Sequence, residues 1–64
     1  TEQDKDLQSW RNMMRCAYEC DEKGDGEKAA SFLAYADQFC EKWGWGKMTI
    51  EEYKQKLKER RKRK

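Results

Sequence analysis

Histidine and proline are absent from this 64-residue sequence, and glycine occurs only four times. Without histidine, the chain lacks the side chain that most often acts as a general acid or base near neutral pH. A chain of this length also has little interior in which a catalytic pocket could form. We therefore expect a protein that is not an enzyme.

Long apolar runs are missing as well. No stretch approaches the roughly 20 apolar residues of a membrane-spanning helix, and no signal-peptide pattern opens the chain. We therefore expect no membrane partner and a cytoplasmic location, or a nuclear one if the source is eukaryotic. The first residue, Thr1, fits either a domain excised from a larger protein or a start left by removal of an initiator Met.

The three cysteines do not form a recognisable metal or disulfide framework. The spacing of Cys16 and Cys20 resembles that of the twin CX3C proteins of the mitochondrial intermembrane space, but the second pair would need a cysteine where Ala36 stands before Cys40. A structural zinc site uses four Cys or His ligands, and three are present. The acidic residues between 21 and 27 lack the spacing of a calcium loop. We expect reduced, inert thiols and no metal or cofactor, with a disulfide or a metal as the alternative.

Apolar residues recur at helical spacing in two segments, residues 4–22 and 27–42, and no strand pattern occurs. Two glycines in three residues make the segment 23–26 a cap and turn between the helices. The Trp-Gly-Trp-Gly segment 43–46 closes the second helix and forms an aromatic loop. The sequence therefore predicts a helical hairpin.

A third helix is predicted to begin at residue 49 or 50, because Thr49 and Glu52 have the spacing of a capping box. Nothing apolar follows Leu57, so this helix should pack through its first two turns and then fray or project. The predicted fold is all-α: a helical hairpin plus a shorter third helix that ends in a basic tail, with one domain at 1–57 and an extension at 58–64. The predicted core consists of Leu7, Trp10, Met14, Ala17, Phe32, Leu33, Ala36, Phe39, Cys40, Trp43, Ile50, Tyr53 and Leu57.

The charge is distributed very unevenly along the chain. Residues 54–64 hold eight of the fifteen Lys and Arg residues and one of the thirteen acidic residues, so they carry about +7 and residues 1–53 about −5. A cationic segment attracts polyanions because binding releases their condensed counterions. We therefore expect a small accessory or regulatory protein that binds RNA or DNA, with Trp45 as a base-stacking contact. The predicted nucleic-acid-binding residues are Lys54, Lys56, Lys58, Arg60, Arg61, Lys62, Arg63, Lys64 and Trp45.

Two other interpretations of the same segment stay open. The tail could be a solvated extension, as runs of charge usually are. Alternatively, the chain could be a protein-interaction module, a small inhibitor or adaptor that uses the tail on an acidic partner. That module should expose a contiguous apolar patch of several hundred Å². The candidate patch residues are Tyr18, Tyr35, Trp45 and Met48.

Residues 46–56, GKMTIEEYKQK, resemble the pattern of SHOCT-type short helical domains, in which a Gly precedes a Thr- or Ser-capped helix with paired acids, an aromatic residue and a downstream Lys. The likeness covers roughly residues 33–58. It implies a small helix–turn–helix unit that serves oligomerisation or interaction. In the SHOCT pattern apolar residues usually follow that Lys, whereas charged residues follow it here. The resemblance assigns no functional residue.

Overall fold

The structure is a computed structural model that describes the backbone of residues 1–62 and the side chains of residues 1–60. It contains three helices, α1 (Glu2–Glu22), α2 (Gly26–Trp43) and α3 (Ile50–Lys62), and residues 1–62 contain no strand. The all-α prediction is therefore confirmed. Helix α1 begins two residues before the predicted start, because Thr1 accepts a hydrogen bond from the Asp4 backbone N–H and caps the helix.

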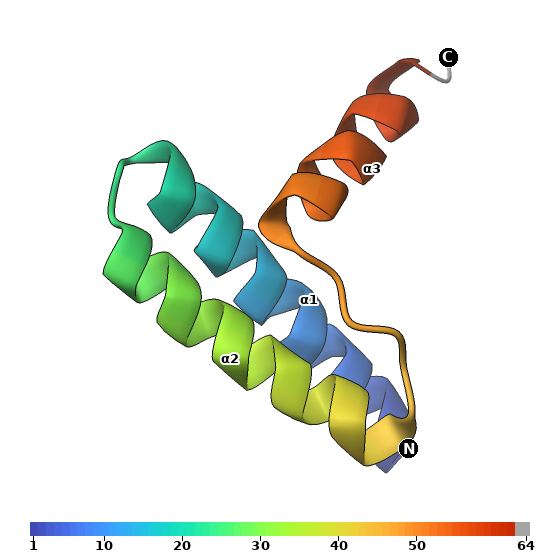
Figure 1. The fold of residues 1–64 in the computed structure, drawn as a ribbon. Coiled ribbons are helices and arrows are strands. Elements are labelled where there is room, and N and C mark those ends of the chain that lie inside the picture. Colours follow the sequence, from blue (N-terminus) through green and yellow to red (C-terminus); the bar gives the residue numbers. More distant parts are fainter. Residues whose placement is uncertain (63–64) are drawn as a thin grey trace.

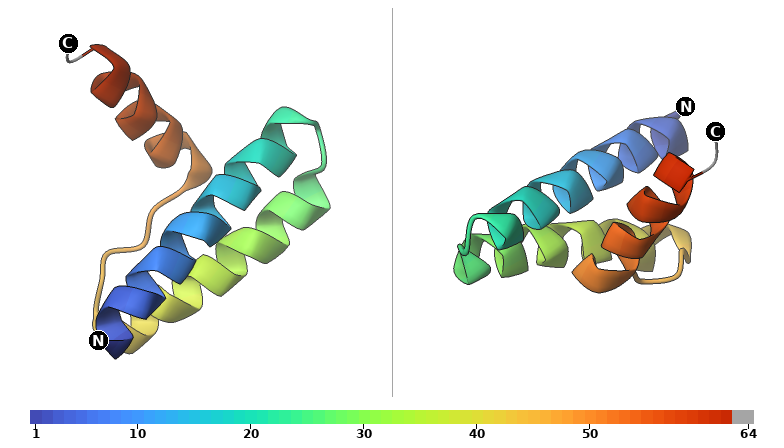
Figure 2. Two further views of the ribbon diagram at one scale, coloured as in Figure 1. Left: turned by 180° about the vertical axis from the view of Figure 1, so that it is seen from behind. Right: turned by 90° about the horizontal axis from the view of Figure 1, so that it is seen from above.

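Helices α1 and α2 lie antiparallel and side by side, which confirms the predicted hairpin (Figure 1). The linker of residues 44–49 runs from the end of α2 back along the hairpin, and α3 then leaves the hairpin at a steep angle, as the left view of Figure 2 shows. The Cα radius of gyration, 12.1 Å, exceeds the roughly 10.7 Å typical of a compact 64-residue domain. The difference reflects the projecting third helix.

The predicted caps and turns are present. At the end of α1, Gly24 adopts a left-handed φ of 86°, its N–H donates to the Asp21 carbonyl, and the Asp25 N–H donates to the Cys20 carbonyl. This pair of bonds is a Schellman motif. At the start of α3, the Thr49 hydroxyl accepts from the Glu52 N–H at 3.2 Å while the Glu52 carboxylate accepts from the Thr49 N–H at 3.1 Å. The predicted capping box is confirmed.

The buried core is a narrow seam between α1 and α2. Its fully buried residues are Met14 and Ala17 of α1 and Ala29, Ala36 and Cys40 of α2. All of these except Ala29 belong to the predicted core. The other predicted core residues are only partly buried, because no third layer covers the hairpin. This corrects the prediction for Leu7, Trp10, Phe32, Leu33, Phe39, Trp43, Ile50, Tyr53 and Leu57.

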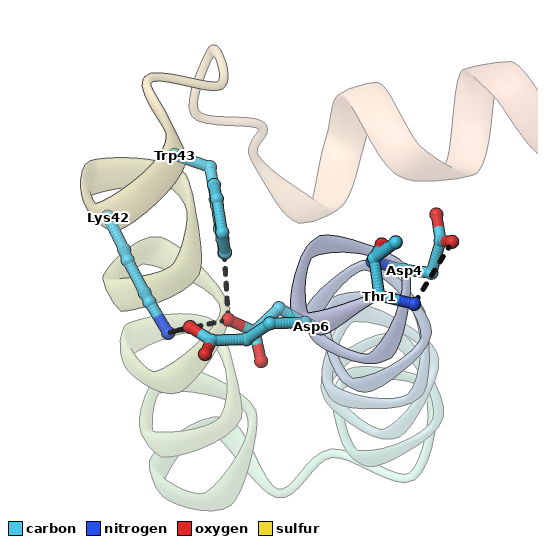
Figure 3. Close-up of polar contacts among 6 residues, drawn as sticks. Thr1, Asp4, Asp6, Lys42 and Trp43 are labelled. Carbon is cyan, nitrogen blue, oxygen red and sulfur yellow. Dashed lines mark hydrogen bonds and ion pairs between the residues drawn. The ribbon is translucent and has the colours of Figure 1, made fainter.

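A polar cluster joins the first turns of α1 to the last turn of α2. The Asp6 carboxylate accepts a hydrogen bond from the Trp43 indole N–H at 2.7 Å and one from the Lys42 ammonium at 2.9 Å (Figure 3). Lys42 also donates to Glu2 at 2.8 Å. The hydrogen bond from Lys42, followed by that from Trp43, holds the pKa of Asp6 below its ordinary value. This cluster closes the open end of the hairpin opposite the turn.

The two glycines of the hairpin turn should respond differently to alanine. Gly24→Ala should lower stability by about 1–2 kcal/mol, because the left-handed conformation brings a Cβ close to the following carbonyl. Gly26→Ala is the matched control: Gly26 opens α2 without a positive φ, no atom lies within 4 Å of an added Cβ, and alanine favours the helix. Thermal melts followed by circular dichroism should show a midpoint lower by several degrees for Gly24→Ala alone. Equal melting temperatures would contradict the assigned turn.

The Asp6 cluster predicts an acid-dependent part of the stability. A carboxyl whose pKa is lowered in the folded state stabilises that state above its unfolded pKa, ordinarily 3.8, and this stabilisation is lost as the pH falls through the lower folded value. Asp6→Asn should therefore have a lower melting temperature than the wild type at neutral pH. The difference between the two melting temperatures should shrink below about pH 4. A gap that stays constant down to about pH 2 would show that Asp6 does not act through its charge.

Candidate nucleic-acid interface

Helix α3 is attached to α1 by its first turns. The ring of Tyr53 packs against that of Tyr18, with centroids 6.0 Å apart and planes inclined at 58°. Beside this pair, the Lys54 ammonium binds the Asp21 carboxylate at 2.9 Å and the Glu22 carboxylate at 3.1 Å. These contacts bring the side chain of Lys54 to 23% exposure and raise its pKa, mainly through the hydrogen bond to Asp21 and then that to Glu22. The start of α3 is thereby fixed near the C-terminal end of α1.

An open groove of about 590 Å³ lies between the N-terminal half of α1 and the later turns of α3. Trp10, Tyr53, Leu57 and the linker residue Met48 supply its apolar surface. The polar lining comes from two helix faces, since residues spaced three or four apart share a face of a helix. These polar residues are Gln8, Arg11, Asn12 and Arg15 of α1 and Lys56, Glu59 and Arg60 of α3.

The groove is electrostatically positive, because four of its side chains are cations and one is a carboxylate. Arg15 pairs with Glu19 of its own helix at 3.7 Å, but both side chains are more than half exposed, and an exposed pair of this kind is weak. Within the described part of the chain, Arg11, Lys56 and Arg60 make no ion pair. The groove therefore presents cations whose charge is largely uncompensated.

The opposite flank of α3 has a different character. A second hollow there is lined by Lys54 and Lys58 together with the acidic residues Glu22 and Glu51. The ammonium of Lys54 lies 5.8 Å from the centre of the Tyr18 ring, in addition to its two ion pairs. Lys54 and Lys58 thus lie beside carboxylates on this flank. Lys56 and Arg60 instead share the groove with the arginines of α1.

The predicted nucleic-acid-binding residues therefore do not lie together. The structure brings Lys56 and Arg60 into the groove and places Lys54 and Lys58 on the opposite flank. Trp45 is partly buried and stacks on Trp43, with ring centroids 6.3 Å apart and planes inclined at 22°. Arg63 and Lys64 lie outside the described residues. The backbone of Arg61 and Lys62 belongs to α3, but their side chains are not described.

Arg11 and Arg15 are the groove residues that the sequence prediction missed. Residues 1–53 are acidic as a whole, so the prediction treated them as one acidic body. A local signal was present, because residues 7–18 contain two arginines and no acidic residue. Their spacing of four places both arginines on one face of α1. What the sequence could not supply is that α3 would face them.

The four residues predicted to form an apolar docking patch are also separated. Trp45 and Met48 line a common small pocket, while Tyr18 packs against Tyr53. Among the large apolar side chains of the described residues, that of Tyr35 on α2 is exposed to solvent, at 56%. Two of the four residues thus share a surface.

Of the three cysteines, Cys40 lies in the core as predicted. Cys40 is buried in the seam, whereas Cys16 and Cys20 lie partly buried on α1, and none of the three forms a disulfide. Burial raises the pKa of the Cys40 thiol, and the neighbouring Trp10 N–H partly opposes this shift. That N–H makes no hydrogen bond of standard geometry with the described residues. Within the described part of the chain, no group of three or more His, Cys, Asp or Glu side chains is arranged to hold a metal ion.

Comparison of the chain with protein-family models, with curated proteins and with solved structures found no match. The SHOCT resemblance therefore stays a prediction. Among the described residues, none of the three helices combines the length and apolar character that crossing a membrane requires.

The ion pairs of Lys54 predict how firmly α3 is held. Lys54→Gln should raise amide hydrogen exchange in the first turns of α3 by about two- to fivefold, since an ion pair at a partly exposed site is weak. Lys58→Gln is the matched control, because Lys58 lies one turn further along the same flank and is exposed. Equal exchange rates in the two variants would show that the Lys54 pairs do not hold α3 in place.

Proposed function

We propose that this protein is a non-catalytic accessory or regulatory factor that binds nucleic acid in the groove between α1 and α3. The observation that carries the proposal is the convergence of Arg11, Arg15, Lys56 and Arg60 from two helices on one groove. Such a function would place the protein in the cytoplasm, or in the nucleus of a eukaryotic cell.

The chemistry of the lining residues supports this proposal. Three of the four cations are arginines, whose planar guanidinium groups can donate two parallel hydrogen bonds to phosphate oxygens. Cations on both walls of a groove can contact successive phosphates of one backbone, and each contact releases condensed counterions. The single carboxylate of the lining, Glu59, reduces this attraction without cancelling it.

The distribution of acidic residues favours one orientation of the ligand. Asp21 and Glu22 lie beyond the other flank of α3, where they bind Lys54. A polyanion that approached this flank would meet two carboxylates, whereas one that approached the groove would meet mainly cations. We infer that Lys54 holds α3 in position for binding.

A protein-interaction module is the alternative proposal. Its support is the exposed ring of Tyr35 and the shared pocket of Trp45 and Met48. We favour nucleic acid because the groove unites four cations, while the four aromatic and apolar residues of the candidate patch do not gather on one surface.

The salt dependence of binding tests the proposal. If all four groove cations contact phosphates, they should contribute about −2.8 to −3.6 to the slope of log affinity against log salt, the smaller value applying to single strands. Each of the variants Arg11→Gln, Arg15→Gln and Arg60→Gln should weaken binding and reduce the steepness of the slope by about 0.7–0.9. Fluorescence anisotropy with a labelled oligonucleotide measures both quantities.

Lys23→Gln is the matched control for these variants. Lys23 is exposed at the hairpin turn, outside the groove, and its substitution changes the net charge by the same amount. It should leave the slope unchanged. The proposal fails if no oligonucleotide binds at about 50 mM salt, or if the control reduces the slope as much as the groove variants do.

A further inference from the structure

A small apolar pocket adjoins the basic groove. Trp10 and Met48 line both hollows, so the two lie side by side. The remaining walls of the pocket, about 160 Å³ in volume, are formed by Leu7, Trp45 and Gly46, and none of its lining residues is charged. The pocket thus brings two tryptophan side chains next to the cations of the groove.

The pocket is built by contacts that fix its aromatic wall. The Trp45 backbone N–H donates to the Cys40 carbonyl at 2.9 Å, and the Cys40 thiol donates to the Gly46 carbonyl at 3.7 Å. The Trp45 ring stacks on Trp43, whose indole N–H is held by Asp6 at 2.7 Å. Because the wall is ordered through these contacts, a ligand does not bear the full cost of arranging it.

We propose that the ligand of the groove is a single-stranded nucleic acid with one unpaired base inserted into the pocket lined by Trp10, Trp45 and Met48. This inference rests on the proposed function. A single strand combines two features that this surface can bind. Its phosphates can contact the cations, and the flat apolar face of a base can stack on the tryptophans. A duplex keeps its bases paired and stacked inside, so it would engage the cations and leave the pocket unfilled. Polyphosphate has no base at all.

Three ligands separate these contributions: a labelled single strand of about twelve nucleotides, the duplex of the same sequence, and inorganic polyphosphate as a competitor. For the wild-type chain, the single strand should bind at least about tenfold more tightly than the duplex. It should also quench the intrinsic tryptophan fluorescence, whereas polyphosphate should not. These measurements need no substitution, so they do not depend on whether a variant folds.

Trp45→Ala tests the pocket directly. Loss of one stacking contact should weaken single-strand binding by about fivefold or more and leave the competition by polyphosphate unchanged. Tyr35→Ala removes an exposed aromatic residue of α2 and should change neither. Equal affinities for single strand and duplex, with no effect of Trp45→Ala, would overturn this inference and leave the proposed function standing. Failure of both oligonucleotides to bind would overturn the two together.

Discussion

The close packing of α1 against α2 is the constraint from which the rest of this structure follows. Small residues such as Ala17 and Ala36 lie fully buried in the seam, so the two helices approach closely and leave no room for a third helix between them. Helix α3 must therefore attach to the outside of the hairpin. It does so through an aromatic pair and a lysine held by two carboxylates, both at its start. Because only its first turns are held, the later turns diverge from α1 and leave the groove open.

The same attachment sorts the cations of α3 into two classes. Lys54 faces the acidic end of α1 and is neutralised within the molecule, while Lys56 and Arg60 face Arg11 and Arg15. Like charges brought together across a groove repel one another, and such an arrangement lowers stability unless something is bound there. A chain that tolerates four cations around an apolar surface is well suited to a ligand that supplies negative charge and flat rings. This is the physical reason for preferring a nucleic acid to a neutral protein surface.

Most of the fold could be predicted from local patterns. The hairpin follows from the helical spacing of Met14, Ala17 and their counterparts in α2, and the capping box of Thr49 sets the start of α3. The extent of the core could not be predicted, because burial depends on how many layers cover a face, and periodicity describes only the face. The candidate site was half predicted. The density of charge after residue 53 indicated eight basic residues, and Lys56 and Arg60 are the two of them, among the described side chains, that line the groove. Arg11 and Arg15 join these two only through the angle at which α3 meets α1.

The most direct test of the central claim is to map the bound ligand on the protein. Titration of the ¹⁵N-labelled chain with a short oligonucleotide, followed by amide chemical shifts, reports on each described residue. The account predicts that the largest changes cluster on the groove face of α1, around Arg11 and Arg15, and on Lys56 and Arg60 of α3, with little change along α2. Changes confined to the residues after Arg60, or centred on α2, would contradict the claim that the groove between α1 and α3 is the binding site.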